Sequence, residues 1–296
     1  MGTADSASSP DVQASPIGQW RTRVLVWGDS GTSATGFGTV IRHLVRGLAA
    51  TGLYEIDQIG INFTGDYYDR AEHPCRIYPA LGAGYRDVFG RDRLLKVLAG
   101  EDGVLRGPWE ILFTIQDHFV IDEIQAELKA SRGRLTEAGS PLTWIGYCPV
   151  DSPLRERWVD GVIMAPEFPV LYTKYAHREV MRFDPTVERG YRQRLRVIPH
   201  GVDCATFRAL PAAEVAAFRE FYFQGKVKPG TFLVVNVNRN QPRKDLVRQL
   251  LFVREHPEEA GRIAADAQEW VQGLRWERVL NEYWLPLFAR AARSQE

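Results

Sequence analysis

Short apolar runs alternate with segments of helical spacing over the first two hundred residues. Residues 22–27 (TRVLVW) form a β-branched, apolar run that predicts a strand, and a glycine-rich loop follows at 28–38 (GDSGTSATGFG). Residues 39–52 then repeat apolar positions every three or four residues, which predicts a helix. Its expected buried stripe and its stop are Ile41, Leu44, Val45, Leu48 and Gly52.

The same alternation continues up to about residue 200. Further apolar runs predict strands at 56–62, 109–115, 141–148, 161–165 and 169–173. Residues 120–131 (VIDEIQAELKAS) carry helical spacing between two of these runs. Nearly continuous apolar strands that alternate with helices are typical of a parallel sheet covered on both faces. We therefore expect residues 21–200 to form a doubly wound, Rossmann-like α/β domain.

The remainder of the chain has a different pattern. Residues 194–203 (RLRVIPHGVD) close the first block, and residues 231–237 give the one convincing strand that follows. Helical spacing then dominates to the end of the chain, over 253–271 and 274–292. Because one strand cannot build a second sheet, we expect residues 201–296 to hold a shortened Rossmann-like domain followed by closing helices.

Composition adds limits on location and partners. Residues 1–20 are rich in Ser, Ala, Pro and Gly, which predicts a disordered arm. The 37 basic residues balance 37 acidic ones, so no global charge draws the chain to nucleic acid or a membrane. The three cysteines are widely spaced, and no apolar stretch is long enough to cross a bilayer. A cytoplasmic protein without a metal site is the resulting expectation.

The glycine-rich loop is the first candidate site. Gly36, Phe37 and Gly38 stand where the loop enters the predicted helix, and glycine allows backbone amides to approach an anion closely. The alternative is that these glycines only make a tight turn between strand and helix. The spacing matches neither the dinucleotide fingerprint nor the phosphate-loop motif, which disfavours those two classes of enzyme, epimerases included.

Two further candidates follow predicted strands, where ligands bind in open α/β sheets. Gln116, Asp117 and His118 come directly after residues 109–115, and a histidine beside a carboxylate can exchange a proton near neutral pH. Asp151 follows residues 141–148, where it can face a sugar hydroxyl. For both aspartates the alternative role is to cap the next helix.

A basic pair is the fourth candidate. Arg239 and Lys244 lie in residues 238–245 (NRNQPRKD), between a predicted strand and a predicted helix. A planar guanidinium and a compact ammonium together can neutralise a diphosphate. The alternative is a solvated loop.

Taken in order, these motifs resemble the family 4 glycosyltransferases, which have the GT-B architecture and retain anomeric configuration. Residues 35–52 resemble the family's first glycine-rich loop and helix, and residues 197–207 (VIPHGVDCATF) resemble its interdomain segment. Residues 238–244 are similar to its GRxxxxK element, with Asn238 in place of the usual glycine. Residues 276–288 (WERVLNEYWLPLF) resemble its closing helix.

The resemblance implies a nucleotide-sugar donor and an acceptor of unknown identity, without a cofactor or a metal. By this resemblance, Gly36 and Gly38 approach donor phosphate or acceptor, His118 sits beside the reacting sugar, and Arg239 with Lys244 binds the diphosphate. The family's EGFGLP-like stretch does not occur in the sequence. A noncatalytic, shortened homologue that acts as a binding or regulatory module is therefore the alternative, and uncovered apolar surface in such a domain favours a homo-oligomer.

Overall fold

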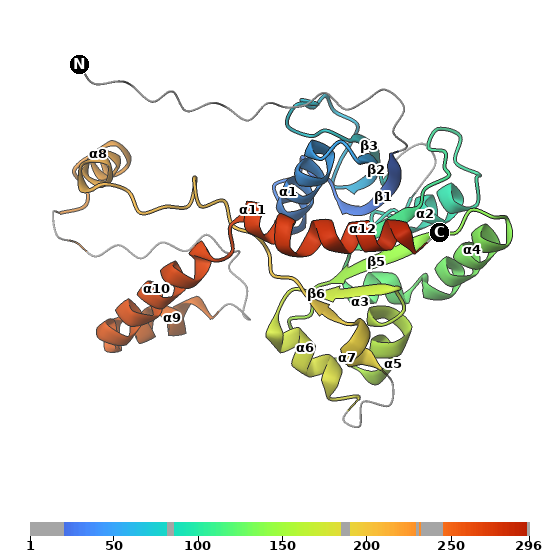
Figure 1. The fold of residues 1–296 in the computed structure, drawn as a ribbon. Coiled ribbons are helices and arrows are strands. Elements are labelled where there is room, and N and C mark those ends of the chain that lie inside the picture. Colours follow the sequence, from blue (N-terminus) through green and yellow to red (C-terminus); the bar gives the residue numbers. More distant parts are fainter. Residues whose placement is uncertain (1–20, 82–85, 185–189, 229–230, 232–244, 295–296) are drawn as a thin grey trace, which may run out of the picture. The chain divides into compact units, whose positions relative to one another are not determined.

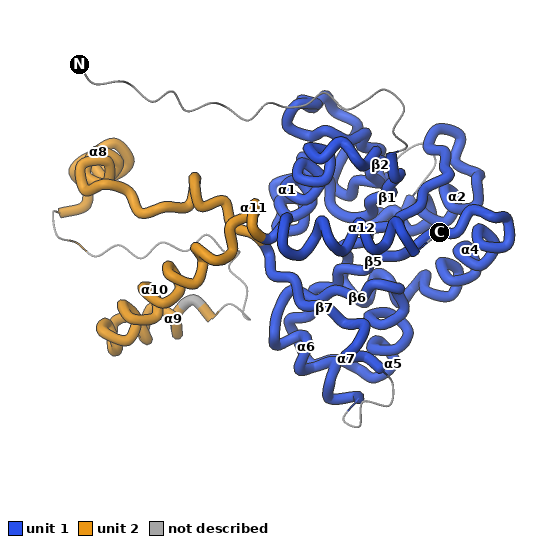
Figure 2. Tube along the Cα trace, in the orientation of Figure 1, with its two compact units in different colours: residues 1–200, 279–296 blue, residues 201–278 orange. Residues whose placement is uncertain are grey.

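The computed structural model describes residues 21–81, 86–184, 190–228, 231 and 245–294 (Figure 1). The chain forms two compact units, one of residues 1–200 with 279–296 and the other of residues 201–278 (Figure 2). The expected arm at 1–20 and the expected strand at 231–237 lie outside the described residues, apart from Thr231. None of the described helices has the length and apolar character that crossing a membrane requires.

The first unit is built on a parallel sheet of seven strands. Their order across the sheet is β3-β2-β1-β4-β5-β6-β7. Every neighbouring pair is parallel, which confirms the expected α/β class with a doubly wound sheet. The strands are β1 Thr22–Asp29, β2 Tyr54–Ile61, β3 Arg76–Pro79, β4 Ile111–Ile115, β5 Thr143–Cys148, β6 Phe168–Leu171 and β7 Arg196–Val197.

Helices cover both faces of this sheet. In chain order they are α1 Gly36–Ala50, α2 Arg91–Leu98, α3 His118–Asp122, α4 Gln125–Glu137, α5 Glu156–Trp158, α6 Lys174–Met181 and α7 Tyr191–Arg194, with a π-helix η1 at Val159–Ile163. Side chains of β4 show the two faces, because Leu112 joins the core beneath α2 and α4 while Phe113 packs on the C-terminal helices. Successive side chains of a strand point to opposite faces of the sheet, so the buried residues of β4 contribute to a core on each face.

Helix α1 begins at Gly36, three residues before the predicted segment 39–52, and ends at Ala50. The hydroxyl of Thr35 caps it by accepting a hydrogen bond from the Gly38 amide at 3.0 Å. Gly52 follows the last turn with a φ of 71°, a left-handed conformation that suits glycine. The expected stripe, Ile41 to Leu48, is buried against the sheet.

The C-terminal residues return to the first unit. They form the π-helix η3 (Leu280–Trp284) and α12 (Leu285–Arg293), and Trp284 and Phe288 are almost completely buried. Leu280 packs closely against Gly47 of α1, because a Cβ at position 47 would lie 2.3 Å from the Leu280 side chain. The two units divide near residue 200, and residues 279–296 group with the first unit.

Two local expectations differ from the structure. Residues 161–165 were expected as a strand, but Gly161 to Ile163 belong to η1 and no described strand includes them. Their apolar run is buried in either conformation, so burial alone does not distinguish a strand from a helix. Strand β3 (RIYP) has only four residues, two of them half-buried, and too little apolar character to be predicted.

The second unit consists of helices in its described part. These are α8 Ala212–Phe223, α9 Leu246–Glu255, α10 Pro257–Gln272 and most of α11 Trp276–Val279. Trp276 is the buried side chain among its described residues, and it packs against Gly201. Phe207, Phe221 and Trp270 are 70%, 74% and 66% exposed. The described helices of this unit therefore bury little apolar surface.

Candidate functional site

The strand order places a ligand-binding position between β1 and β4. Chain progression across the sheet reverses there, since β2 and β3 lie on one side of β1 and β4 to β7 on the other. In open α/β sheets the loops at the carboxyl ends of such strands diverge and leave a crevice. Asp29 ends β1, Gln116 to His118 follow β4, and Asp151 follows β5 by three residues.

The loop between β1 and α1 is held by its own polar groups. The Thr35 hydroxyl donates a hydrogen bond to Asp29 Oδ2 at 2.5 Å and accepts one from the Gly38 amide. Arg42 Nε donates to the Gly31 carbonyl at 2.9 Å, and Gln58 Nε2 donates to the Asp29 carbonyl at 2.8 Å. The loop is therefore fixed, with the first residues of α1 following the carboxyl end of β1.

The predicted glycines have different surroundings. A Cβ on Gly38 would lie 2.6 Å from the Ser30 carbonyl oxygen and 2.4 Å from Ser33 Oγ, so the close turn explains this glycine. A Cβ on Gly36 would meet nothing within 4 Å, and Gly36 is exposed. Packing therefore accounts for Gly38 and leaves Gly36 open to a ligand.

Alanine at Gly36 and at Gly38 is expected to change the stability of the fold differently. Gly38→Ala should destabilise the fold by about 1–3 kcal/mol because the new methyl overlaps backbone oxygens. Gly36→Ala should leave the stability unchanged or raise it by up to about 1 kcal/mol, because alanine suits a helix better than glycine. Urea unfolding of both variants checks this, and an equal loss at the two positions would contradict it.

Asp117 stands within electrostatic reach of two other carboxylates. Burial raises its pKa, and the neighbouring charges of Asp151 and Asp29 raise it further. Although Asp117 occupies the N-cap position of α3, its side chain makes no capping hydrogen bond. Asp151 is exposed and does not cap a helix either, since α5 begins at Glu156 with Arg155 at its N-cap. The capping alternatives for both aspartates are therefore not supported.

Removing the charge of Asp117 is expected to stabilise the protein. A carboxyl whose pKa is raised on folding binds its proton more tightly in the native state, so its contribution to stability falls as pH rises from the ordinary aspartate value, about 3.9, through the raised one. Asp117→Asn should therefore melt above the wild type at pH 7, with the difference disappearing near pH 3. Thermal melts across pH check this, with Asp266→Asn on the exposed face of α10 as the charge-matched control.

His118 begins α3 and packs against an aromatic wall. Its ring centroid lies 4.3 Å from that of Trp158 and 5.9 Å from that of Phe119. Burial lowers the pKa of His118, while the carboxylates of Asp151 and Asp122 partly oppose that effect. The imidazole is therefore held toward its neutral form at neutral pH, which is the form that accepts a proton.

Two buried polar atoms in this region have no partner in the part of the chain that the structure describes. They are Nδ1 of His118 and Nε2 of Gln116. Buried polar groups are normally hydrogen-bonded, so such orphans at a crevice indicate groups that a ligand or a water satisfies. Sequence reasoning gave a role to Asp117 and His118 and missed one for Gln116, which directly precedes them.

The structure adds residues that sequence reasoning did not select. Asp29 is the last residue of β1, a place at a strand end like the one that marked Asp117. Trp158 had no sequence signal, because forty residues separate it from His118. Tyr172 and His200 stack with centroids 4.9 Å apart and an interplanar angle of 9°, at the ends of β6 and β7. Burial lowers the pKa of His200.

Two further questions are the position of the basic pair and the presence of metal ligands. Arg239 and Lys244 lie outside the described residues, so their predicted role in binding a diphosphate stays a prediction. Within the described ranges, no three His, Cys, Asp or Glu side chains are grouped in a way that holds a metal ion.

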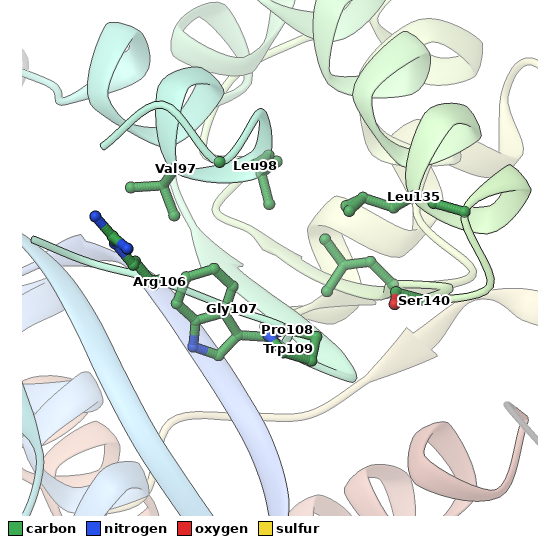
Figure 3. Close-up of a pocket in the computed structure, with 11 residues that line it drawn as sticks. Val97, Leu98, Arg106, Gly107, Pro108, Trp109, Leu135 and Ser140 are labelled. Atoms are coloured by element: carbon green, nitrogen blue, oxygen red, sulfur yellow. The ribbon is translucent and has the colours of Figure 1, made fainter. Parts of the chain in front are cut away.

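A separate hollow lies at the other end of the strands from the candidate residues. Figure 3 shows it beneath Val97, Leu98 and Leu135, with the Trp109 ring on its floor. Its volume is about 410 Å³. Trp109 and Leu142 precede β4 and β5, so this hollow is at the amino ends of the strands. The carboxylates and His118 lie at the carboxyl ends, and the hollow is therefore not part of the candidate site.

Comparison with known proteins finds a structural likeness at low sequence identity. No protein-family model matches the chain, and no curated protein matches it. Among solved structures, a glycosyltransferase from Rickettsia africae ESF-5 is similar, with 11% identity over 86% of this chain and 67% of that chain, and a TM-score of 0.48. A likeness at this level assigns neither a family nor an activity to this chain.

Proposed function

We propose that this protein transfers a sugar from a nucleotide-sugar donor to an acceptor, as a member of the retaining family 4 glycosyltransferases of GT-B architecture. The observation that carries the proposal is the clustering of Asp29, Asp117, His118 and Asp151 beside the β1–α1 loop. The order of motifs along the sequence supports it independently, from the glycine-rich loop through 197–207 to 238–244.

The side chains of the crevice have complementary tasks in such a reaction. Carboxylates accept hydrogen bonds from sugar hydroxyls, so Asp117 and Asp151 suit an acceptor or donor sugar. His118, held toward its neutral form, suits a group that hydrogen-bonds a hydroxyl or takes up a proton. The exposed start of α1 at Gly36 offers amides to a phosphate or to the acceptor.

Charge builds up on the nucleoside diphosphate as it departs. Donors that are fixed before the reaction stabilise such charge strongly. Arg239 and Lys244 have the chemistry for this, a planar fork and a point charge at a separation of five residues. No metal is needed in this scheme, since the cationic pair and the loop amides supply the positive potential.

Donor dependence tests the proposal directly. The full chain is incubated with UDP-glucose, GDP-mannose or ADP-glucose, and the released nucleoside diphosphate is measured with and without sugar or polyol acceptors. We expect release with one class of donor, and a loss of release in Arg239→Ala. Turnover that is unchanged in both Arg239→Ala and His118→Ala would overturn the site assignment.

A noncatalytic binding module is the second candidate function. Trp276 as the buried side chain among the described residues of the second unit favours it, together with the absence of the EGFGLP-like stretch from the sequence. Such a protein keeps an acceptor-binding first unit without a donor site. Calorimetry with the same three nucleotide sugars separates the two functions, because tight donor binding contradicts the noncatalytic one.

Self-association is expected from the second unit. Its exposed aromatic side chains, among them Phe207, Phe221 and Trp270, present apolar surface to water, and covering such surface is favourable. Light scattering should therefore show a mass that rises with protein concentration. A monomer at all concentrations, with a single sharp melting transition, would contradict the expectation.

A further inference from the structure

An indole touches the imidazole of His118 and is itself anchored. The Trp158 ring lies 4.3 Å from the His118 ring, centroid to centroid, at an interplanar angle of 57°. Trp158 Nε1 donates a hydrogen bond to Asp122 Oδ2 at 2.9 Å. His118 and Asp122 are four residues apart on α3, one turn of the same helix face, so a single indole spans both.

Asp122 is in turn fixed by other groups. Gln125 Nε2 donates to Asp122 Oδ1 at 3.0 Å, and the Arg157 guanidinium lies 3.3 Å from Oδ2. A Cβ on Gly161 would lie 2.5 Å from Gln125 Oε1, so the backbone of η1 also packs against this group. Each carboxylate oxygen therefore has a partner, and the acceptor of the indole N–H cannot rotate freely.

The backbone carrying Trp158 is also constrained. Trp158 ends α5 and is followed at once by the π-helix η1, whose Val159 and Val162 are almost completely buried. The indole packs against two apolar clusters, one that includes Leu128 of α4 and one that includes Val180 of α6. Arg155 and Arg157 lie over its ring at 5.1 and 5.6 Å. Packing on several sides fixes a ring better than one contact does.

We propose that Trp158 is a positioning residue for His118, and that its indole, anchored on Asp122, holds the imidazole at the carboxyl end of β4 and shields it from water. The catalytic part of this proposal rests on the proposed function, because it presumes that His118 meets the substrate. The positioning itself does not, and it can be measured on the protein without any substrate.

Several charges face the imidazole besides Asp122. Asp151 reaches it from the loop after β5, and Asp117 precedes it in the chain. Arg155 and Arg157 lie against the indole instead. Removing the indole admits water, and because burial is the larger cause of the lowered pKa of His118, the pKa should rise. Removing only the charge of Asp122 should lower it further, since that charge favours the protonated ring.

Histidine NMR of the full chain tests the proposal. Proteins labelled with ¹³C-histidine are titrated between pH 4 and 9, and the His118 signal is assigned by its absence in His118→Gln. The variants are Trp158→Leu, Trp158→Phe and Asp122→Asn, with Trp270→Leu as a control that removes an exposed indole. Melting temperatures follow in parallel, so that a loss of stability is distinguished from a change at His118.

We expect the pKa of His118 to rise in Trp158→Leu and to fall in Asp122→Asn. In Trp270→Leu it should not change. Trp158→Phe keeps a ring but loses the N–H anchor, and we expect a changed His118 chemical shift from an intact fold. If Trp158→Leu does not fold, the other two variants decide. Variants that lose stability while His118 titrates as in the wild type would overturn the proposal, whether or not the protein transfers sugar.

Discussion

Replacing His118 by alanine is expected to lower the proposed sugar transfer by about 10²–10⁴-fold while the protein stays folded. The physical reason is that a fixed imidazole in its neutral form is removed from the crevice where Asp117 and Asp151 meet. The rate of nucleoside diphosphate release with the preferred donor measures the effect, and a melting curve monitors the fold.

The matched control is His177→Ala on α6. His177 is also partly buried and its pKa is likewise lowered, by burial and by the nearby charge of Arg192, but it lies outside the group at β1, β4 and β5. Its replacement should leave the rate unchanged. An equal loss in both variants would show that the effect is not specific to the site.

The same histidine predicts a pH dependence. Because burial lowers its pKa, the imidazole stays neutral below the ordinary histidine range and is protonated only at lower pH. A reaction that needs the neutral ring should therefore lose rate on the acid side, below the lowered pKa. That limb of the profile should be absent from the residual activity of His118→Ala.

Truncation of Phe288 to alanine is expected to destabilise the protein by about 3–5 kcal/mol. This ring is completely buried and packs on Tyr54, Phe113 and Trp284, with centroids 5.8, 5.7 and 6.3 Å away. Its loss leaves a cavity between the C-terminal helix and the sheet. Urea unfolding measures the change in the free energy of unfolding.

Two controls define that result. Phe288→Leu keeps most of the apolar volume and should lose much less stability. Trp270→Ala removes a larger ring that is 66% exposed in α10, and it should change the stability little. A Phe288→Ala loss below about 1 kcal/mol would contradict the packing of α12 on the first unit.

Much of the first unit follows from local patterns in the sequence. Residues 24–27 and 111–113 are apolar on successive positions, so both faces of these strands must be buried, and parallel strands with helices on both sides satisfy that requirement. The apolar stripe of helix α1 and its stop at Gly52 were predictable, because both signals are local. The loops after β1, β4 and β5 could be selected for the same reason.

Other features depended on contacts between distant segments. Residues 161–165 carry an apolar run that can be buried in a strand or in a helix. In the structure Val162 and Ile163 are buried within η1. The return of residues 279–296 to the sheet joins Trp284 to Phe113, which no periodicity along the chain encodes. The contact between Trp158 and His118 arises in the same way.

The sequence by itself therefore determined the class of the sheet, the apolar stripe of α1 and the polar residues at the strand ends, because each depends on neighbours a few positions away. Only the tertiary structure decided which of those residues meet. The reversal of strand order between β1 and β4 brings Asp29 within reach of Asp117, and the packing of α3 against α5 sets Trp158 on His118. Strand order and packing are properties of the whole core, and a local pattern does not contain them.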